Sequence, residues 1–146
     1  MDQLSSCTFC DIAQGAEPAH IILEDARSIA FLDIAPAAEG HSLVIPRTHA
    51  RTLLDIESDS AGALMSFATR VARLIDRTVR PDGLTMVQTN ERAGGQSVFH
   101  VHLHLVPRWN GDNLMRPWRA RRVPAESLEA TRLKLIGGIL DPSTNY

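Results

Sequence analysis

The stretch Phe99-His100-Val101-His102-Leu103-His104-Leu105-Val106-Pro107 alternates histidine with apolar residues, and the rest of the chain is interpreted outward from it. A β-strand sends successive side chains to opposite faces, so this alternation predicts a strand over 98–107. The apolar residues would enter the core, and the three histidines would share the other face. Three histidines in strict alternation are hard to explain by structure alone, because each gives up apolar area or needs a polar partner. The row therefore predicts a functional site.

Two roles for this row follow from imidazole chemistry. Histidines two residues apart on a strand are common zinc ligands, so the row could hold a catalytic metal. A neutral imidazole can also attack phosphorus, and a pKa of about 6.5 leaves much of it neutral at physiological pH. The loop from Asn90 to Ser97 favours phosphate chemistry, because Gly94 and Gly95 let backbone N–H groups approach an anion and Gln96 adds a neutral donor.

Patterns on both sides of the row predict an α+β fold, with a mostly antiparallel five-stranded sheet and one long helix. Besides 98–107, strands are expected at 20–24, 28–32, 41–45 and 84–89, and a short helix is expected at 7–14 with Gly15 as its stop.

The long helix is expected over 59–80, where an apolar residue recurs every three or four positions and makes one buried stripe. Ser58 or Asp59 would cap its start, and Pro81 and Gly83 would end it. The arginines on the other side of this helix predict a solvated face.

Composition limits the class of protein. The 146 residues suffice for one domain, and 44% hydrophobic with 22% charged residues is typical of a globular chain. A net charge of −2 disfavours a protein held to nucleic acid by phosphate neutralisation. No apolar run approaches the ~20 residues of a transmembrane helix, and the start, Met1 to Ser6, lacks the basic and apolar regions of a secretory signal. A cytoplasmic protein without membrane or nucleic-acid partners is expected.

The C-terminal part differs from the rest in charge. Residues 108–146 carry six Arg and one Lys against four acidic residues, whereas residues 1–107 carry eight Arg against 13 acidic residues. We place a domain at 1–112 and a basic tail at 113–146, with a helix expected at 124–136. A basic cluster with a tryptophan could bind a polyanion, but a tail that packs on its own domain or on a dimer partner, anchored by Trp118, is the simpler interpretation.

Cys7 and Cys10 are the only cysteines and form one CxxC. In a reducing compartment this spacing indicates metal or redox chemistry more than a structural disulfide. Two cysteines supply half of a tetrahedral zinc site, so the other ligands have to come from elsewhere in the chain.

Taken together, these stretches resemble a known family. Residues His100 to Val106 match the signature of the histidine triad (HIT) superfamily, His-φ-His-φ-His-φ-φ, where φ is apolar. The resemblance runs from Cys7 to Asp112, and several separated matches in the right order make it specific. The other matches are Phe31 to Ile34, Gly40 to Pro46 with His49, and Asn90 with Gly94 to Ser97.

The resemblance implies nucleotide chemistry. HIT proteins hydrolyse or transfer nucleotides through a nucleotidyl-histidine intermediate at the middle histidine, here His102, and water then releases a nucleoside monophosphate. By the same match His104 would contact the phosphate and assist the leaving group, and Gln96 and Ser97 would hold phosphate oxygens. The remaining matches imply ribose binding by Asp33, a phosphate site lined by Asn90 and Gly95, and an apolar base pocket of Phe9, Ile12, Phe31 and Ile34.

The resemblance also gives the CxxC a role. Many bacterial HIT proteins hold a zinc with an N-terminal CxxC, the histidine after the Ile-Pro strand and the first histidine of the triad, which here are Cys7, Cys10, His49 and His100. A closed Cys₂His₂ set leaves no open coordination position, so one structural zinc per chain is expected. Mg²⁺ would be an optional companion of a polyphosphate substrate.

A homodimer with sheets that meet edge to edge is implied as well. The segment from Leu105 to Asp112 is more similar to the fragile-histidine-triad and bacterial branch, which prefers dinucleoside polyphosphates. We therefore predict hydrolysis of these or related purine nucleotide conjugates at the α-phosphate, which requires a His102 ring that substrate can reach. Three alternatives stay open: Hint-type hydrolysis of nucleoside phosphoramidates or acyl adenylates, a nucleotide-binding regulatory protein with incidental hydrolysis, and a metalloenzyme that uses all three triad histidines.

Overall fold

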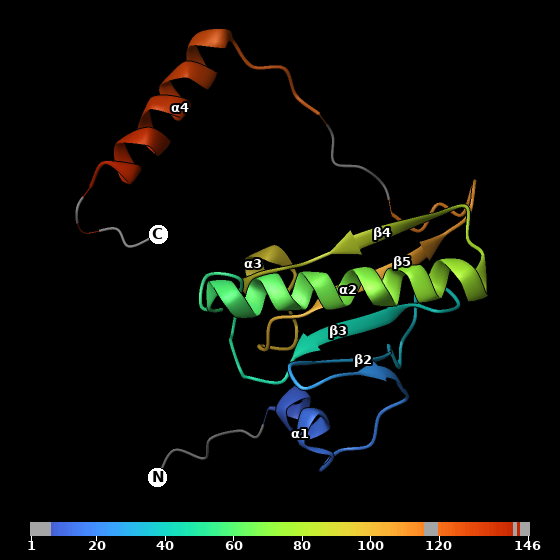
Figure 1. The fold of residues 1–146 in the computed structure, drawn as a ribbon. Coiled ribbons are helices and arrows are strands. Elements are labelled where there is room, and N and C mark those ends of the chain that lie inside the picture. Colours follow the sequence, from blue (N-terminus) through green and yellow to red (C-terminus); the bar gives the residue numbers. More distant parts are fainter. Residues whose placement is uncertain (1–6, 116–119, 142, 144–146) are drawn as a thin grey trace. The chain divides into compact units, whose positions relative to one another are not determined.

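The computed structural model describes residues 7–115, 120–141 and 143 (Figure 1). The chain divides into two compact units, Met1–Leu114 and Met115–Tyr146. In chain order the elements are α1 (Thr8–Gln14), β1 (Ile21–Glu24), β2 (Ser28–Leu32), β3 (Ser42–Pro46), α2 (Ser58–Val79), β4 (Gly83–Val87), α3 (Glu91–Gly94), β5 (Leu103–Arg108) and α4 (Ala125–Ile139).

The five strands form one sheet in the order β1-β2-β3-β5-β4, and every pairing is antiparallel. This confirms the α+β fold with a five-stranded antiparallel sheet. β5 is the last strand in the chain but lies inside the sheet, between β3 and β4. Its His104 is paired with Leu43 on one side and with Val87 on the other, so this histidine lies well inside the sheet.

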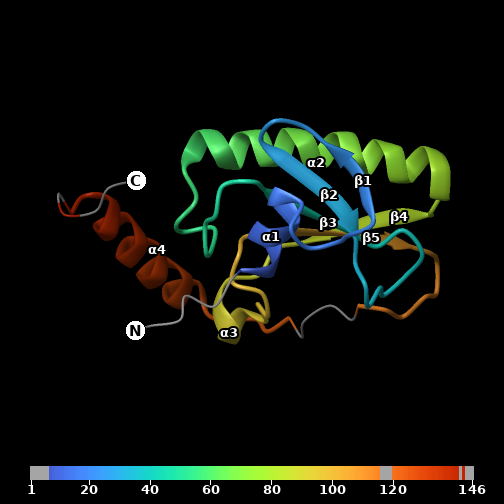
Figure 2. The ribbon, with the colours of Figure 1, turned by 90° about the horizontal axis from the view of Figure 1, so that it is seen from below.

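The long helix α2 covers one face of the sheet (Figure 2). Its apolar stripe makes a single core with residues from three strands. The members are Leu64, Phe67, Ala68, Val71 and Ile75 of α2, with Ala30, Val44, Leu103 and Leu105 of the sheet. Because Leu103 and Leu105 face α2, the two-residue period of a strand turns His104 toward the opposite face.

The opposite face of the sheet carries α1 (Figure 2). This short helix ends at Gly15, whose φ of 76° is the left-handed conformation that favours glycine. Its Phe9 and Ile12 form a second core with the alternate residues of β2 and β3, which are Ile29, Phe31, Leu43 and Ile45. His104 is therefore on the face that carries α1.

The strand predicted over 98–107 is wrong at its beginning. β5 starts at Leu103, and residues 98–102 have an irregular backbone. Pairing with β3 reaches only to Leu103, while the N–H of Val101 donates to the carbonyl of Ala50 at 2.7 Å, outside any strand. His100 and His102 consequently enter the site from an irregular segment rather than from a shared strand face.

Two local expectations also need correction. α2 begins after Glu57, which makes no side-chain capping hydrogen bond, so neither Ser58 nor Asp59 is its cap. The loop at 90–97 contains one helical turn, α3.

The second unit contains α4 (Ala125–Ile139), at the place where the sequence predicted a helix over 124–136. Trp118, the predicted anchor of the tail, lies outside the described residues. Among the helices that the structure describes, none is long and apolar enough to cross a membrane.

Candidate functional site

His102 lies between aromatic rings on the sheet face that carries α1. Its ring centroid is 4.9 Å from that of His104 and 5.2 Å from that of Phe9, which meets it edge-on. Its Nδ1 lies 2.6 Å from the backbone carbonyl of His100. A carbonyl only accepts hydrogen bonds, so Nδ1 carries the proton and the lone pair is on Nε2. Burial lowers the pKa of His102, which keeps this ring neutral and its Nε2 nucleophilic.

The His102 side chain is less open than the sequence led us to expect. The residue is only 4% exposed. Attack on a phosphorus atom requires the substrate to reach Nε2 through this small exposed edge or after a neighbouring side chain has moved. Access to His102 is therefore the first condition that a nucleotidyl-transfer function has to meet.

A chain of hydrogen bonds fixes the tautomer of His104. The N–H of Ala37 donates to Nδ1 of His41 at 3.0 Å, so neutral His41 carries its proton on Nε2. That Nε2 donates to Nδ1 of His104 at 2.9 Å. Burial lowers the pKa of His41, and it lowers that of His104 to about 4, so both rings are neutral near pH 7. His104 therefore carries its proton on Nε2, where it can donate a hydrogen bond.

His41 was not predicted as a site residue. It stands directly before β3, two residues from Leu43, and Leu43 is paired with His104. Extending the two-residue period of β3 by one step puts His41 on the same face as His104. Strand register, which the sequence alone does not give, was the missing signal.

Asp33 completes this group. Its Oδ2 lies 3.5 Å from Nε2 of His41 and 3.8 Å from Nδ1 of His104, and its Oδ1 accepts the N–H of Ala35 at 2.8 Å. The three side chains have the composition of a metal site. However, a metal-bound histidine offers a lone pair and donates its other N–H, whereas Nδ1 of His41 accepts and its Nε2 is protonated. The Asp33–His41–His104 cluster is therefore a hydrogen-bonded cluster and not a metal site.

A second cluster brings together Cys7, Cys10, His49 and His100, as predicted for zinc, and their ligand atoms all lie within 4.8 Å of one another. Nδ1 of His100 is 3.4 Å from Sγ of Cys7, and Nδ1 of His49 is 3.3 Å from Sγ of Cys10. Ligands bound about 2.0–2.3 Å from a tetrahedral zinc are separated by roughly 3.3–3.8 Å, so the spacing suits this metal.

The hydrogen bonding of His100 supports the same conclusion. Its Nε2 donates to the carbonyl of Pro46 at 2.8 Å, which leaves the lone pair on Nδ1, facing both cysteines. Burial lowers the pKa of His100 to about 4 and keeps it a neutral ligand. Without a metal, burial and Cys7 raise the pKa of Cys10 to about 11, whereas Zn²⁺ would deprotonate this thiol. The four residues fit a structural zinc.

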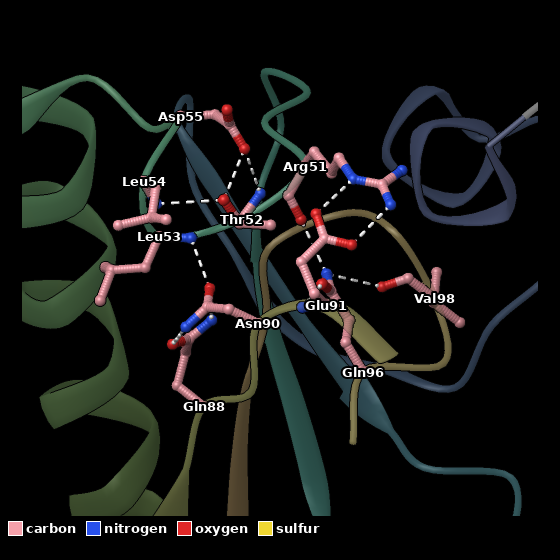
Figure 3. Close-up of polar contacts among 10 residues, drawn as sticks. All are labelled: Arg51, Thr52, Leu53, Leu54, Asp55, Gln88, Asn90, Glu91, Gln96 and Val98. Atoms are coloured by element: carbon pink, nitrogen blue, oxygen red, sulfur yellow. Dashed lines mark hydrogen bonds and ion pairs between the residues drawn. The ribbon is translucent and has the colours of Figure 1, made fainter. Parts of the chain in front are cut away.

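Gln96 and its surroundings are shown in Figure 3. Its Oε1 accepts the N–H of Glu91 at 2.8 Å, and its Nε2 donates to the carbonyls of Arg51 at 2.7 Å and Val98 at 3.1 Å. The sequence predicted Gln96 as a phosphate ligand, but here its buried amide is fully engaged with the backbone. The side chain holds the loop that leads to the triad.

Asn90 ties the same loop to the turn after His49 (Figure 3). Its Oδ1 accepts the N–H of Leu53 at 2.7 Å, and its amide exchanges two hydrogen bonds with the amide of Gln88, at 2.9 and 2.8 Å. These bonds fix the orientation of the Asn90 amide.

Gly95 and Ser97 form the end of the loop. Gly95 has a φ of 94°, which favours glycine, and it ends α3. Ser97 is exposed and lines a hollow of about 400 Å³ together with Cys7, His49 and Phe99. Its hydroxyl is therefore accessible from solvent, as a phosphate ligand has to be.

The four residues predicted as a base pocket are not equivalent. Phe9, Ile12 and Phe31 are buried in the core between α1 and the sheet, and the rings of Phe9 and Phe31 meet edge-on with centroids 5.5 Å apart. Ile34 is 92% exposed. Of the four, only Ile34 has a large exposed apolar side chain.

Comparison with known proteins agrees with this geometry. The family model described as HIT domain matches residues 14–111. An uncharacterised HIT-like protein of Mycoplasma genitalium is 42% identical over 105 residues, which cover 72% of this chain and 74% of that protein. A shorter match of 50 residues, 34% of this chain and 26% of the other, is 40% identical to the AP-4-A phosphorylase of Mycobacterium tuberculosis.

Two solved structures are similar to this chain over most of its length. A zinc-bound histidine triad family protein from Mycobacterium smegmatis has a TM-score of 0.72 and 38% identity, covering 90% of this chain and 96% of that one. A histidine triad nucleotide-binding protein from Candida albicans has a TM-score of 0.84 and 30% identity, covering 92% and 97% of the two chains.

Proposed function

Since the chain belongs to the HIT family, we propose that it hydrolyses dinucleoside polyphosphates or related purine nucleotide conjugates at the α-phosphate, through a covalent intermediate on His102. The observation that carries this proposal is the pair of tautomers at the site. His102 presents a lone pair on Nε2 and its neighbour His104 presents an N–H on Nε2, which supply the nucleophile and a hydrogen-bond donor for the leaving oxygen.

The first step forms a bond between Nε2 of His102 and the α-phosphorus and breaks the bond from phosphorus to the leaving oxygen. His104 donates a hydrogen bond from Nε2 to that oxygen and keeps its proton, so the negative charge that develops on the departing phosphate group is stabilised. The hydroxyl of Ser97 binds a phosphate oxygen, and Asp33 accepts the ribose hydroxyls through Oδ2, its less engaged oxygen.

In the second step water attacks the phosphorus and the His102–phosphorus bond breaks. His102 leaves as a neutral imidazole, the attacking water gives one proton to the solvent, and a nucleoside monophosphate departs while Nε2 of His104 keeps its hydrogen bond to the phosphate. Asn90 and Gly95 line the phosphate site and Gln96 acts by holding the loop. Ile34 offers its exposed side chain to the base, while Phe9, Ile12 and Phe31 support the site from the buried core. Any Mg²⁺ would arrive with the polyphosphate.

Zinc is the proposed cofactor, held by Cys7, Cys10, His49 and His100. With four protein ligands it would supply a cross-link rather than a Lewis acid, joining the start of α1 to the segment before β5.

The proposed assembly is a homodimer in the cytoplasm. β4 is an edge strand, and its Leu84 and Met86 are 39% and 46% exposed. An exposed edge with apolar side chains suits continuation of the sheet into a second copy. For the tail at 113–146 we propose packing on the domain or on that second copy.

The test is a panel of adenosine and guanosine dinucleoside polyphosphates, phosphoramidates and acyl adenylates, assayed with the full chain and with His102→Ala. Turnover by the variant should fall by about 10³-fold or more, with nucleotide binding retained. Rapid quenching of the wild-type reaction should trap a nucleotidyl adduct on the peptide that contains His102. His20→Ala is the control, because His20 is exposed and outside the site, and it should keep full activity.

The panel also separates the alternatives. Faster turnover of phosphoramidates than of polyphosphates would replace the substrate class with the Hint type. Binding without wild-type turnover would favour a regulatory nucleotide-binding protein. Full activity of His102→Ala would reject the covalent mechanism.

A further inference from the structure

Glu91 has a backbone conformation that its side chain disfavours. Its φ is 59°, in the left-handed region, where a Cβ crowds the backbone. Among the described residues only Arg80 and Asn113 share this property without being glycine. Arg80 ends α2, but Glu91 begins the short segment that leads to Ser97 and the triad. A strained residue at the entrance of a site is held there by its surroundings and often serves the function of the site.

Glu91 is held by contacts from two directions (Figure 3). Its carboxylate accepts two hydrogen bonds from Arg51, from Nε to Oε1 and from Nη2 to Oε2, both at 2.7 Å. Its backbone N–H donates to Gln96, and the amide of Gln96 donates to the carbonyl of Arg51. The three residues therefore form a closed ring of contacts, which we call the Arg51–Glu91–Gln96 clasp.

The clasp joins two segments that carry site residues. Arg51 follows the metal ligand His49 by two residues, and its guanidinium carbon lies 4.1 Å from the centre of the Phe99 ring. Phe99 lies between Ser97 and His100, and the peptide of Val101 is bonded to Ala50, beside Arg51. The clasp therefore fixes how the loop with Ser97 lies against the segment that supports the zinc cluster.

Stability alone does not account for the clasp. Arg51 and Glu91 are both about half exposed, and ion pairs of this kind contribute little to folding because solvent screens them. A bidentate guanidinium–carboxylate pair does fix direction, because two parallel hydrogen bonds leave little rotational freedom. Geometry rather than stability is what this pair supplies.

We propose that Arg51 and Glu91 are positioning residues for the reaction, because their ion pair holds the 90–97 loop in the shape that places the Ser97 hydroxyl at the phosphate on His102. This inference rests on the proposed function. Opening the pair would leave the loop attached through Gln96 but free to shift, and a small shift of a phosphate ligand lowers the rate of the chemical step.

A double-mutant cycle with Glu91→Gln and Arg51→Gln tests this, with kcat and KM measured on the best substrate of the panel. Each single substitution should lower kcat about tenfold with KM changed less than about twofold, since a transition-state contact is displaced. The double variant should lose about tenfold as well, and not about a hundredfold, because both substitutions break one interaction. Unfolding midpoints should stay close to that of the wild type.

The control is Glu129→Gln. Glu129 forms an equally exposed bidentate pair with Arg132 in α4, at 2.8 and 2.7 Å, so it matches the lost chemistry outside the site. The kcat of Glu129→Gln should equal that of the wild type. Two results would overturn the proposal. One is a kcat within about twofold of wild type in the single variants of Arg51 and Glu91, and the other is a double variant in which the two losses of kcat multiply.

A second measurement separates this inference from the proposed function. Amide hydrogen exchange across 92–99 should be faster in Glu91→Gln than in the wild type and unchanged in Glu129→Gln. If the wild type turns over no substrate, the proposed function fails and exchange still decides on the clasp. Equal exchange in wild type and Glu91→Gln would show that the pair does not hold the loop.

Discussion

His100 and His104 lie two residues before and two residues after His102, yet the protein prepares them for opposite chemistry. Both are neutral near pH 7, because burial lowers the pKa of each to about 4. His100 donates from Nε2 to the carbonyl of Pro46 and keeps a lone pair on Nδ1. His104 accepts at Nδ1 from His41 and keeps a proton on Nε2.

The difference shows that the partner of the second ring nitrogen decides what a histidine does. A carbonyl partner leaves a lone pair on the other nitrogen, which suits a metal ligand or a nucleophile, and a donor partner leaves an N–H there. The Cys7–Cys10–His49–His100 cluster and the Asp33–His41–His104 cluster should therefore respond differently to the same kind of substitution.

Cys10→Ser should have the largest effect. It removes one of four zinc ligands, so bound zinc should fall from one per chain to none, and the unfolding midpoint should drop by roughly 10 °C. Metal analysis and thermal unfolding measure both quantities. If Cys10→Ser retained a full equivalent of zinc, the metal would have to be bound by other residues, and the two clusters would not differ in metal binding.

His41→Phe should spare the zinc and impair the reaction. Without the donor on His41, His104 no longer has a fixed tautomer, and turnover should fall about a hundredfold. Metal analysis should still give one zinc per chain, and an unfolding curve checks that the variant is folded. Wild-type turnover in this variant would mean that His41 does not set the state of His104.

Phe9→Leu tests an aromatic side chain that contacts two of the triad histidines. The centroid of the Phe9 ring lies 6.0 Å from that of His100 and 5.2 Å from that of His102. The free energy of unfolding should fall by about 1 kcal/mol in chemical denaturation. Turnover should fall as well, because the ring no longer supports His102. Phe67→Leu is the matched control, since Phe67 is buried in the core under α2. An equal loss of turnover in both variants would assign the effect to stability alone.

The smallest expected effect is the loss of folding stability at low pH that comes from His104. Its folded pKa of about 4 is below the unfolded value of about 6.5, so the unfolded chain binds the proton more readily between these values. Stability from this group is complete above about pH 6.5 and decreases as the pH falls toward 4. Between pH 7 and 5 the unfolding midpoint should therefore drop a few degrees more in the wild type than in His104→Asn. Parallel curves would show that His104 titrates normally.

Periodicity and spacing in the sequence predicted much of the fold. The apolar stripe predicted α2, and the hairpin of β1 and β2 was evident from two short apolar runs around Asp25. The alternation across 98–107 predicted a longer strand than β5, because periodicity does not reveal which backbone groups pair with a neighbouring strand. Only residues from Leu103 onward pair with neighbouring strands.

The site was predictable as a set of residue types and less so as geometry. The four residues that the resemblance implied as zinc ligands lie close enough together to hold a metal. His41 was missed because its proximity to His104 depends on strand register. Gln96 was expected to face phosphate because of its type, but a buried amide binds the nearest unpaired backbone groups, and here these are in the loop itself.

The position of β5 has a consequence for synthesis on the ribosome. The strand completed last is inserted between β3 and β4, so both have an unpaired edge until residues near 108 have left the exit tunnel. Cys7 also cannot contact His100 until that residue, 93 positions later in the chain, has been synthesised. Nascent chains that stall before this point carry open strand edges that invite pairing with other chains, and assembly of this protein is therefore most vulnerable to aggregation shortly before its final strand emerges.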